Sequence, residues 1–501
     1  MTDSIWEHNL TLNQLLEWLG IEPLAADIKL SGLATDSRRV SSGELFLALP
    51  GFATDGRDYI EAAIKAGAVA VLAEAGRDLS FVNVPVVQVC NLHARAGGLI
   101  DFALGQPSRD INVIGVTGTN GKSSSVHFVA ELLEQMSSGC GVMGTLGQGR
   151  AGHLENMGNT TADILTCHSF AARMRQQNVG WMATEISSHG LDQGRVNGLR
   201  IDTAVFTNLT RDHLDYHKTM EAYAAAKGKL FAHPGLRHAI FNADDPAAET
   251  LRGFAPESVE CLNCSLSDSS ADLYLKNIEL LPDGMKATVV TPWGTGTLET
   301  SLIGRFNLSN LLGVVAVLGC HNFPLNDVLA AIKHLASVPG RLESYGGGTQ
   351  PVVVIDYAHT SDALKSVLLA LREHGGRRIS CVFGCGGDRD RGKRPLMAQA
   401  ACAGADHVYV TSDNPRSEEP RSIIDDALTG VTGDALDKVT VVVDRAEAIA
   451  LAVSNAAPGD VVLVAGKGHE CYQEIKGVRY PFSDLDQVTQ ALTHLQAGRV
   501  A

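Results

Sequence analysis

The chain has 501 residues, of which 45% are hydrophobic and 19% are charged, and its formal net charge at pH 7 is −15. One hydrophobic core stops growing near roughly 250–300 residues, so this length predicts two to four domains. The acidic balance argues against a nucleic-acid-binding or anionic-membrane surface, and an anionic substrate would need a local basic pocket.

The N-terminus, MTDSIWEHNL, carries acids where a signal peptide carries bases. No apolar run approaches the ~20 residues that a membrane span requires. The ten cysteines are spread through apolar stretches, as is expected of reduced thiols buried in the core. We therefore expect a cytoplasmic protein that does not insert into a membrane.

Residues 1–90 are expected to form a first domain. Its predicted elements are a helix at 10–19, strands at 44–49 and 68–73, and a helix at 59–66. A polar segment, TDSRR at 35–39, precedes the first of these strands. The residue types alone leave open whether this segment is a polar turn or binds a ligand.

The most informative motif lies at 111–136, INVIGVTGTNGKSSSVHFVAELLEQM, which reads as a strand, a tight glycine loop and a helix. Such a loop directs backbone N–H groups at an anion, while Lys122 can neutralise phosphate oxygens and Ser123 can bind magnesium. The usual G-x4-G-K-[ST] pattern fails at Val116, where a glycine is expected. The flanking strand and helix nevertheless favour a phosphate-binding loop over an ordinary glycine turn.

Two further polar segments follow in the predicted second domain, residues 91–339. The sequence GNTT at 158–161 would present two hydroxyls and an amide from a loop. An apolar run from Trp181 ends in Glu185. An acid at the end of a strand beside a phosphate loop is placed to hold magnesium directly or through water, and the alternative is a surface glutamate.

Residue types give weaker signals in the rest of this domain. His213 and His217 are four residues apart and would share one face of a helix, as zinc ligands do, but no glutamate follows His213 as H-E-x-x-H requires. A helix at 220–230 carries Lys227, which composition alone predicts to be a solvated surface lysine. Asn307 and Asn310 lie near the start of another helix, where one of them is expected to act as a cap.

The last unit, residues 340–501, has four apolar strand-like runs, each followed by polar residues. The runs are 352–355, 380–383, 407–410 and 461–464. Helical patterns separate them, which predicts a parallel sheet, and ligands bind beyond the carboxyl ends of such strands. The four polar strand ends would therefore form a site.

Taken together, these segments resemble the Mur ligase family of peptidoglycan synthesis. The segments that carry the resemblance are GTNGKS at 118–123, EISSH at 185–189, TNL at 207–209 with DH at 212–213, Asn307 with Asn310, GR at 340–341 and DYAH at 356–359. The resemblance implies an α/β fold with three domains. These are a small α/β UDP-binding domain at 1–90, a central P-loop parallel-sheet ATPase domain at 91–339 and a C-terminal Rossmann-like domain at 340–501.

Within that family the chain resembles the member that forms the tripeptide. This implies a magnesium-dependent and ATP-dependent ligase that adds meso-diaminopimelate to UDP-N-acetylmuramoyl-L-alanyl-D-glutamate through an acyl phosphate. The segment DNPR at 413–416 matches the string that marks family members taking meso-diaminopimelate rather than L-lysine. Arg416 would offer a planar fork to the distal carboxylate that lysine lacks. Ser361 departs from the family, which usually has proline there, and this affects turn rigidity more than chemistry.

The resemblance also assigns residues to each substrate. ATP would be bound by Gly118, Thr119, Asn120, Gly121, Lys122, Ser123, Asn307, Arg341 and Asp356. The UDP-sugar substrate would be bound by Ser37, Thr160, Thr161, Ser187, Gln193 and Arg195. Diaminopimelate would be bound by Arg389, Asp413, Asn414, Pro415, Arg416, Gly466 and Glu470.

The implied catalytic residues are Lys122, Glu185, His213 and Lys227, and the implied magnesium ligands are Ser123, Glu185, His213 and Lys227. Lys227 aligns with a lysine that is carbamylated in the family (N6-carboxylysine), which reverses the surface role that composition alone predicts. The implied partners are small molecules only, with no nucleic acid, and the chain is expected to be a monomer. The resemblance leaves the role of His359 open.

Three alternatives remain at this stage. A lysine-adding ligase would lack an arginine in the segment 413–416. A folylpolyglutamate-type ligase would lack a UDP-binding first domain. A nucleotide-gated binding protein would hydrolyse ATP slowly without any amino acid.

Overall fold

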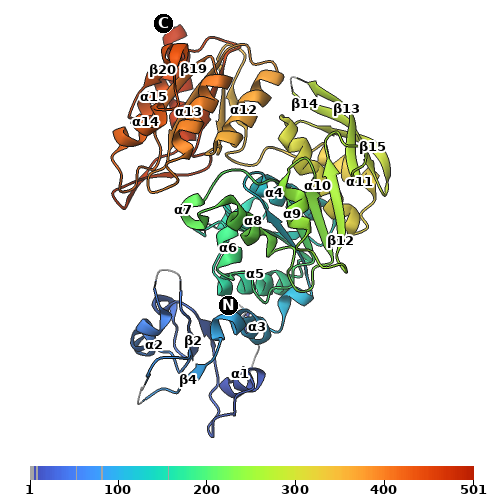
Figure 1. The fold of residues 1–501 in the computed structure, drawn as a ribbon, viewed down its shortest axis with the longest axis vertical. Helices are drawn as coiled ribbons and strands as arrows, with labels where there is room; N and C mark the ends of the chain where they lie inside the picture. The colour runs from blue at the N-terminus through green and yellow to red at the C-terminus, as the bar shows by residue number, and fades with distance from the viewer. Residues whose placement is uncertain are drawn as a thin grey trace.

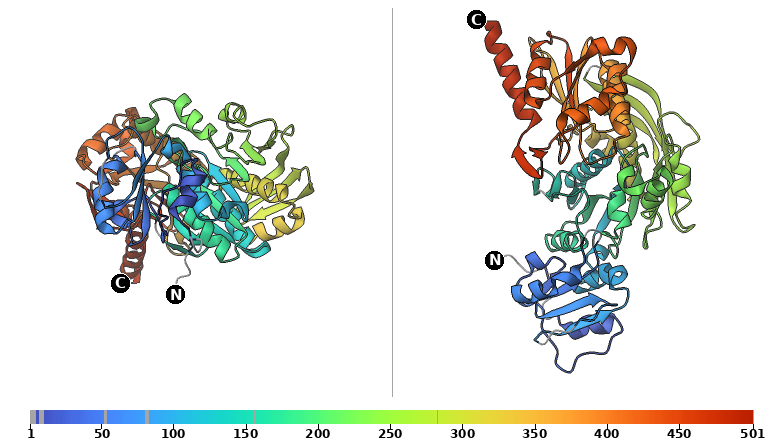
Figure 2. Two further views of the ribbon diagram at one scale, coloured as in Figure 1. Left: turned by 90° about the horizontal axis from the view of Figure 1, so that it is seen from below. Right: turned by 60° about the vertical axis from the view of Figure 1, so that its left-hand side comes forward.

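Three separate sheets, one after another along the chain, organise the molecule (Figure 1). The computed structural model describes residues 5–6, 10–51, 54–79, 83–155, 157–281 and 283–500, with side chains described as far as residue 496. The N-terminal and C-terminal units lie at opposite ends of the central unit, as Figure 1 and the right-hand view of Figure 2 show. The predicted α/β class is confirmed.

The first sheet is parallel, and its strands lie in the order in which they occur in the chain. They are β1 (Gly32–Ala34), β2 (Glu44–Ala48), β3 (Ala70–Glu74) and β4 (Val86–Val89). The helices are α1 (Leu12–Trp18) and α2 (Ile60–Ala66), and α3 (Leu92–Ala103) leads into the next unit. Thr11 and Gln14 form a capping box that fixes the start of α1. The predicted helices and strands of this region are confirmed.

The central sheet has 11 strands in the order β15-β14-β13-β12-β11-β10-β5-β9-β6-β7-β8. They are β5 (Asn112–Thr117), β6 (Cys140–Gly144), β7 (Gly147–Arg150), β8 (His153–Glu155), β9 (Trp181–Glu185), β10 (Thr203–Phe206), β11 (His238–Asn242), β12 (Glu260–Ser265), β13 (Leu273–Leu281), β14 (Gly284–Thr291) and β15 (Gly294–Thr300). The strands from β13 to β6 pair in parallel, and antiparallel strands extend both ends.

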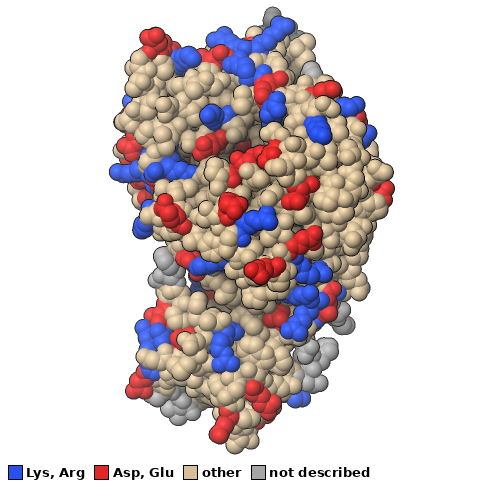
Figure 3. Space-filling view, turned by 45° about the vertical axis from the view of Figure 1, so that its right-hand side comes forward, with Lys and Arg blue, Asp and Glu red and all other residues tan. Residues whose placement is uncertain are grey.

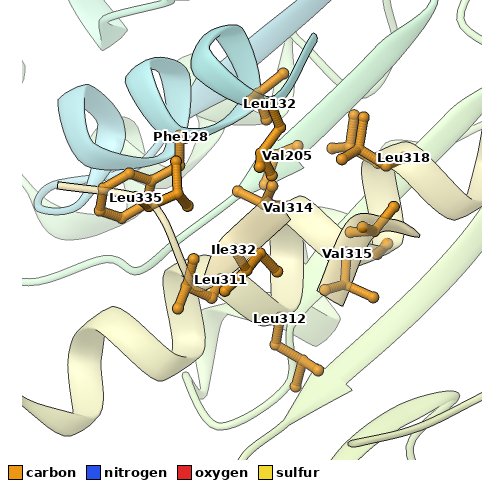
Figure 4. Close-up of a cluster of buried hydrophobic side chains, with 14 of the residues drawn as sticks. Phe128, Leu132, Val205, Leu311, Leu312, Val314, Val315, Leu318, Ile332 and Leu335 are labelled. Carbon is orange, nitrogen blue, oxygen red and sulfur yellow. The ribbon is translucent and has the colours of Figure 1, made fainter. Parts of the chain in front are cut away.

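Helices cover both faces of this sheet. They are α4 (Lys122–Met136), α5 (Ile164–Gln176), α6 (Ser188–Asp192), α7 (Leu214–His217), α8 (Met220–Gly228), α9 (Ala247–Arg252), α10 (Arg305–Cys320) and α11 (Leu325–Ile332). On one face α4 and α10 pack together, with Phe128 and Leu132 beside Val205 and the apolar side of α10 (Figure 4). The other face has its own core, which includes Phe170 and Phe206. The strands between two such cores are held rigidly, and so are the polar residues at their ends.

The third sheet has the order β16-β17-β21-β18-β19-β20. Its strands are β16 (Glu343–Gly346), β17 (Val352–Asp356), β18 (Ile379–Cys385), β19 (His407–Ser412), β20 (Val439–Val441) and β21 (Val461–Ala465), and β22 (Tyr472–Ile475) pairs with β23 (Val478–Pro481) as a separate hairpin. The helices are α12 (Ser361–Glu373), α13 (Lys393–Gly404), α14 (Pro420–Leu428), α15 (Arg445–Ser454) and α16 (Asp484–Val500). The four predicted strands are confirmed, and they pair in parallel.

Three local expectations are wrong. Gly304 is the N-cap of α10 and makes no side-chain cap bond, while Asn307 donates from Nδ2 to the carbonyl of Ile303 at 2.9 Å. His213 lies just before α7 with a φ of +53°, so it does not share a helical face with His217. Of the ten cysteines, Cys90 and Cys471 are exposed rather than buried in apolar surroundings.

The surface carries charged side chains of both signs. On the face drawn in Figure 3, acidic and basic side chains are interspersed. Among the described residues, no helix is both long and apolar enough to cross a membrane.

Candidate functional site

The phosphate-loop segment joins β5 to α4 and requires glycine at two positions. Gly118 and Gly121 have φ values of +148° and +85°. A Cβ atom on Gly118 would lie 1.9 Å from Oγ1 of Thr207, which follows β10. That hydroxyl donates to the carbonyl of Asn120 at 2.6 Å, and the Oδ1 atom of Asn208 accepts from the Asn120 N–H at 2.9 Å. The end of β10 therefore fixes the shape of the loop.

Lys122 folds back over this loop. Its Nζ donates to the carbonyls of Gly118 and Thr119, both at 2.9 Å. Burial lowers the pKa of the Lys122 amine, and the nearby Glu185 carboxylate opposes that shift. A phosphate oxygen bound in the loop would compete with the two carbonyls for this cation.

Glu185 ends β9, is buried, and is held by one residue. Thr145 donates its backbone N–H to Oε1 of Glu185 at 2.8 Å and its hydroxyl to Oε2 at 3.1 Å. Thr161 donates to the backbone carbonyl of Glu185 at 2.9 Å. Thr145 therefore orients both oxygens of the carboxylate, and the burial of Glu185 excludes the alternative of a surface glutamate.

Lys227 is also buried, contrary to the expectation from composition alone. Its Nζ donates to the carbonyl of Gly118 at 2.9 Å and lies 4.4 Å from the centre of the Tyr223 ring. Burial and the charge of Lys122 hold the pKa of Lys227 well below its usual range. An amine that loses its proton easily is nucleophilic and can react with carbon dioxide to give a carbamate.

His213 lies in a group of imidazoles and aromatic rings. Its ring centre is 4.8 Å from that of His189 and 6.1 Å from that of Tyr223. Burial lowers the pKa of His213 to about 3, although the Asp212 carboxylate opposes this. The neutral imidazole keeps a lone pair for binding a cation.

The donor set around the loop fits a magnesium ion. It combines the Glu185 carboxylate and the Ser123 hydroxyl with a neutral imidazole, and a carbamate on Lys227 would add a second anionic oxygen group. Here the Ser123 hydroxyl accepts from Nη2 of Arg341 at 3.0 Å. A cationic group therefore already lies against this hydroxyl.

Arg341 brings the C-terminal unit onto the phosphate loop. Its guanidinium also stacks over Tyr357, 4.6 Å from the ring centre. Asp356 is buried and accepts from the backbone N–H of Leu342 and Ala358 at 2.8 and 2.7 Å. Burial raises the pKa of Asp356, with the charge of Arg341 opposing.

A large cavity of about 1120 Å³ lies between the first and central units. Its lining includes the segment from Thr35 to Arg39 on one side and Gln193 and Arg195 on the other. The Oδ1 atom of Asp36 caps the turn at 37–39 by accepting from the Arg38 N–H at 3.0 Å, and this turn presents Ser37 to the cavity.

A second cavity of about 440 Å³ lies between the central and C-terminal units. Arg195 lines both cavities, so they adjoin at this residue. Five basic side chains line the second cavity. They form a local basic pocket of the kind that an acidic protein needs in order to bind an anionic substrate. They are Arg195, Arg389, Lys393, Arg416 and Arg479.

One corner of the second cavity is built from the strand ends of the third sheet. Asn414 donates from Nδ2 to Oε2 of Glu470 at 2.9 Å, and the buried Lys467 contacts both side chains, at 3.1 and 2.8 Å. The hairpin β22–β23 supports this corner, because the Glu474 N–H donates to Oδ1 of Asn414 at 2.9 Å. Arg416 donates its backbone N–H to the Glu474 carbonyl at 3.0 Å and its Nη1 to the Gly387 carbonyl at 2.8 Å.

The predicted site residues fall into three groups. The first cavity is lined by Ser37, Gln193 and Arg195. The second is lined by Thr160, Thr161, Ser187, Arg195, His213, Arg389, Asp413, Asn414, Arg416, Gly466 and Glu470. Neither cavity is lined by residues 118–123, Glu185, Lys227, Asn307, Arg341, Asp356 or Pro415.

Two of the predicted site residues that line neither cavity are buried beside neighbouring loops. Asn307 is buried beside Asn310, whose Oδ1 would lie 2.6 Å from a Cβ atom on Gly121. Pro415 is buried, and its carbonyl faces Gly387 across the two strand-end loops.

The sequence analysis did not assign Lys393 to the site, and it left the role of His359 open. Lys393 is buried, and its Nζ lies 3.5 Å from Oδ1 of Asp212 in the central unit. His359 approaches the same carboxylate at 3.7 Å. Thr145, which holds Glu185, was also missed. The segment DRDRGKR at 388–394 contains Lys393 and follows the end of a predicted strand. Its position there could have indicated that Lys393 belongs to the site.

Comparison with known proteins follows the same division of the chain. Residues 116–318 match the family described as the Mur ligase middle domain, residues 340–468 match the Mur ligase glutamate ligase domain, and residues 29–101 match the Mur ligase family catalytic domain. A Pseudomonas aeruginosa protein named UDP-N-acetylmuramoyl-L-alanyl-D-glutamate–2,6-diaminopimelate ligase is 50% identical, over 96% of this chain and 98% of its own length. A Coxiella burnetii protein of the same name is 43% identical, over 96% and 99%.

Solved structures agree on the fold. A structure of a UDP-N-acetylmuramoyl-L-alanyl-D-glutamate–2,6-diaminopimelate ligase superposes with a TM-score of 0.71 at 36% identity, covering 98% of this chain and 100% of that one. The MurF ligase from Thermotoga maritima, solved with ADP, has a TM-score of 0.63 at 19% identity, with coverage of 93% and 98%. At that identity the second likeness concerns the fold alone.

Proposed function

The chain belongs to the Mur ligase family, and we propose that it joins meso-diaminopimelate to UDP-N-acetylmuramoyl-L-alanyl-D-glutamate, with ATP as the energy source, in peptidoglycan precursor synthesis. The observation that supports this activity most directly is the second cavity. Arg195 and Thr161 of the central unit lie on its one side, and Asn414, Arg416 and Glu470 of the C-terminal unit lie on the other. An acceptor and an amino acid can therefore meet in this cavity, which is also lined by Thr145, the residue that holds Glu185.

The nucleotide-sugar part of the acceptor would occupy the first cavity. Its volume of about 1120 Å³ suits a ligand of this size, and Ser37 and Gln193 offer hydrogen bonds there. Arg195 would contact the acceptor where the two cavities adjoin. Its Nη1 donates to the Thr161 carbonyl at 2.7 Å, and Thr161 also receives the N–H of Ser187. The peptide end would then lie near Thr160, Thr161 and Ser187.

A carboxylate does not condense with an amine in water at a useful rate, so it must first be activated. The acceptor carboxylate would attack the γ-phosphorus of ATP, forming an acyl phosphate and ADP. The amine of diaminopimelate would then attack the acyl carbon, forming the amide and releasing phosphate and a proton. Lys122 and the N–H groups at the start of α4 would hold the phosphates and offset their charge.

Magnesium would be held by Ser123, Glu185, His213 and a carbamate on Lys227. When bound, the ion neutralises phosphate charge, which lowers the repulsion between two anionic reactants. The protein's own contribution is to orient these groups. Thr145 fixes both Glu185 oxygens, and the lowered pKa of His213 favours its neutral imidazole.

Asn307, Arg341 and Asp356 would bind the nucleotide from both sides of the domain junction. Arg341 already reaches Ser123 across that junction, and Lys393 reaches Asp212. Closure of the C-terminal unit would exclude water from the acyl phosphate. His359 lies on this junction through its contact with Asp212, and we assign it a positioning role there.

Diaminopimelate would be held at the corner formed by Asn414, Arg416, Gly466 and Glu470, together with Arg389 and Asp413. The Arg416 fork suits the distal carboxylate, and the Glu470 carboxylate suits an ammonium group. This arginine disfavours the lysine-adding alternative. The UDP-sized cavity against the first unit disfavours a folylpolyglutamate-type ligase.

We further propose that the enzyme acts as a monomer in the cytoplasm. ATP and nucleotide sugars, the proposed substrates, are cytoplasmic metabolites.

The test is phosphate release from ATP in the presence of magnesium, with each substrate omitted in turn. We expect release only when the UDP-muramoyl-dipeptide and diaminopimelate are both present, and we expect Lys122→Ala to abolish it. Release that is indifferent to the amino acid would instead support the nucleotide-gated binding protein.

A further inference from the structure

A second cluster of ligating side chains lies at the end of the central sheet opposite the phosphate loop. Thr203, His238 and Glu260 are the first residues of β10, β11 and β12. The strand register pairs Thr203 with His238 and His238 with Glu260, so the three form one row across the sheet. Paired residues of parallel strands point to the same face.

That face is the one covered by α10. Val205 and Ile240, two positions further along β10 and β11, belong to the core packed against α10 (Figure 4). Because side chains alternate along a strand, His238 and Glu260 point to the same side as these core residues. Cys320 is the last residue of α10, and this brings its thiol to the row.

We propose that His238, Glu260 and Cys320 bind one divalent transition-metal ion such as Zn²⁺. One ligand atom from each lies within 4.8 Å of the others, and Nδ1 of His238 lies 3.0 Å from an oxygen of Glu260. Across the described ranges of the chain, no other group of three or more histidine, cysteine and acidic side chains meets this spacing. Three protein ligands leave one position of a tetrahedral ion for water.

The chemistry of the ligands separates this site from the phosphate-loop site. Thiolate and imidazole ligands favour zinc and its neighbours in the first transition row, whereas carboxylate and hydroxyl oxygens favour magnesium. Binding would release the thiol proton of Cys320 to solvent. Magnesium in excess should therefore not displace an ion held here.

The proposed site is open to solvent on one side and packed against aromatic rings on the other. The Glu260 side chain is 59% exposed, whereas that of His238 is 16% exposed. On the inner side His321 lies beside His238, with ring centres 5.6 Å apart. Thr203 holds His321 through a 2.9 Å contact to Nε2, and Trp181 packs edge-on against it at 4.7 Å. An ion could enter from the exposed Glu260 side, and the His321 ring would limit its movement on the inner side.

The expected role is structural. The site lies at the amino ends of β11 and β12, whereas the phosphate-binding loop follows the carboxyl end of β5. An ion there would tie the last residue of α10 to the sheet. The first turns of α10 carry Asn310, which lies against Gly121 of the phosphate loop, and Asn307, which Asn310 contacts. The metal would therefore stabilise the helix that supports this loop without touching the substrates.

Cobalt(II) titration of the full-length, chelator-treated protein tests the proposal, with magnesium in excess to fill oxygen sites. We expect a thiolate-to-cobalt charge-transfer band in the near ultraviolet that saturates at one equivalent and disappears when Zn²⁺ is added. Zn²⁺ should also raise the unfolding temperature. Both responses should be lost in Cys320→Ser.

Cys261→Ser is the matched control, because Cys261 follows Glu260 in β12 and packs in the core on the other face of the sheet. This variant should keep the full band. Glu260→Gln changes an exposed side chain and so should fold, and it should weaken cobalt binding about tenfold. No band in the unaltered protein, a band that persists in Cys320→Ser, or an unchanged affinity in Glu260→Gln would each overturn the proposal.

Discussion

Arg416 shows how one residue of the second cavity is held in place. Its backbone adopts a φ of +52°, an uncommon conformation for a residue with a Cβ atom. The hairpin β22–β23 stabilises it, since the Glu474 carbonyl accepts the Arg416 N–H and the Arg416 carbonyl accepts the Lys476 N–H at 2.6 Å. A side chain presented so rigidly loses little entropy when it binds a carboxylate.

Replacing this arginine by lysine should affect one substrate selectively. We expect Arg416→Lys to raise KM for diaminopimelate about tenfold or more, because an ammonium cannot reproduce the two parallel hydrogen bonds of the fork. KM for ATP should change little. Steady-state kinetics with each substrate varied separately would measure the split, with Arg421→Lys as the control on an exposed ion pair with Asp425. Equal rises in both KM values would contradict the assigned role.

Lys227 is assigned a role that requires chemical modification. We expect Lys227→Ala to lower kcat by about 10–100-fold, as disturbing a metal site does. Lys333→Ala, which removes an exposed lysine paired with Glu299, should retain full activity. With ¹³C-labelled bicarbonate, the unaltered enzyme should show a carbamate carbon signal that Lys227→Ala lacks. A fully active Lys227→Ala variant, or the same signal in it, would refute the carbamate.

At the scale of elements, the loop between β5 and α4 depends on its contact with the end of β10. Gly118→Ala should raise KM for ATP about tenfold or more, because the new Cβ would lie 1.9 Å from the Thr207 hydroxyl that holds Asn120. Gly152→Ala is the control, since Gly152 also has a positive φ, +83°, but open space around it. It should lose about 1–2 kcal/mol of stability and no ATP affinity. KM for ATP, measured for both variants, would report the clash with Thr207, and thermal unfolding would report the backbone strain that both substitutions introduce.

The loops that follow β18 and β19 are tied together by Glu418. Its carboxylate accepts from the buried Arg394 at 2.6 and 3.0 Å and from the N–H of Asp388 at 2.7 Å. The hydrogen bonds from Arg394 lower the pKa of Glu418 to about 2. A carboxyl whose folded pKa is lowered stabilises the fold above its unfolded pKa of about 4.3, and this contribution is lost as pH falls towards 2.

Glu418→Gln should therefore destabilise the protein most at neutral pH. We expect a loss on the order of 2–3 kcal/mol at pH 7 that shrinks steadily below pH ~4.3. Urea unfolding at a series of pH values would measure it. Asp425→Asn, in an exposed pair on α14, should cost less than about 1 kcal/mol. A loss in Glu418→Gln that is the same at pH 7 and at pH 3 would contradict the lowered pKa.

Elements were more predictable from the sequence than their contacts. Periodicity was sufficient for the strand, loop and helix at 111–136 and for the four parallel strands after 350, because local pattern and burial agree there. Composition was misleading at Lys227, because the residues near it in sequence do not indicate its contact with Gly118, which lies 109 residues away. The cap expected at Asn307 or Asn310 was also wrong, since Gly304 already supplies the start of α10.

At the scale of the whole molecule, the site depends on contacts between domains. Arg341 reaches Ser123 across 218 residues of chain, Lys393 reaches Asp212 across 181, and Arg211 pairs with Asp390 at 3.0 Å. No local pattern encodes such pairs, so the sequence did not predict that Lys393 would contact Asp212. The same contacts place the corner formed by Asn414, Arg416 and Glu470 opposite Thr161 and Arg195 of the central unit across the second cavity.

The most direct test of the central claim is the mass of the product when meso-diaminopimelate and L-lysine compete at equal concentration. The enzyme would be supplied with ATP, magnesium and UDP-N-acetylmuramoyl-L-alanyl-D-glutamate. We expect one amide product whose mass equals the dipeptide substrate plus diaminopimelate minus water, with one phosphate released per product. A product containing lysine, or ADP formed without any new amide, would contradict the account.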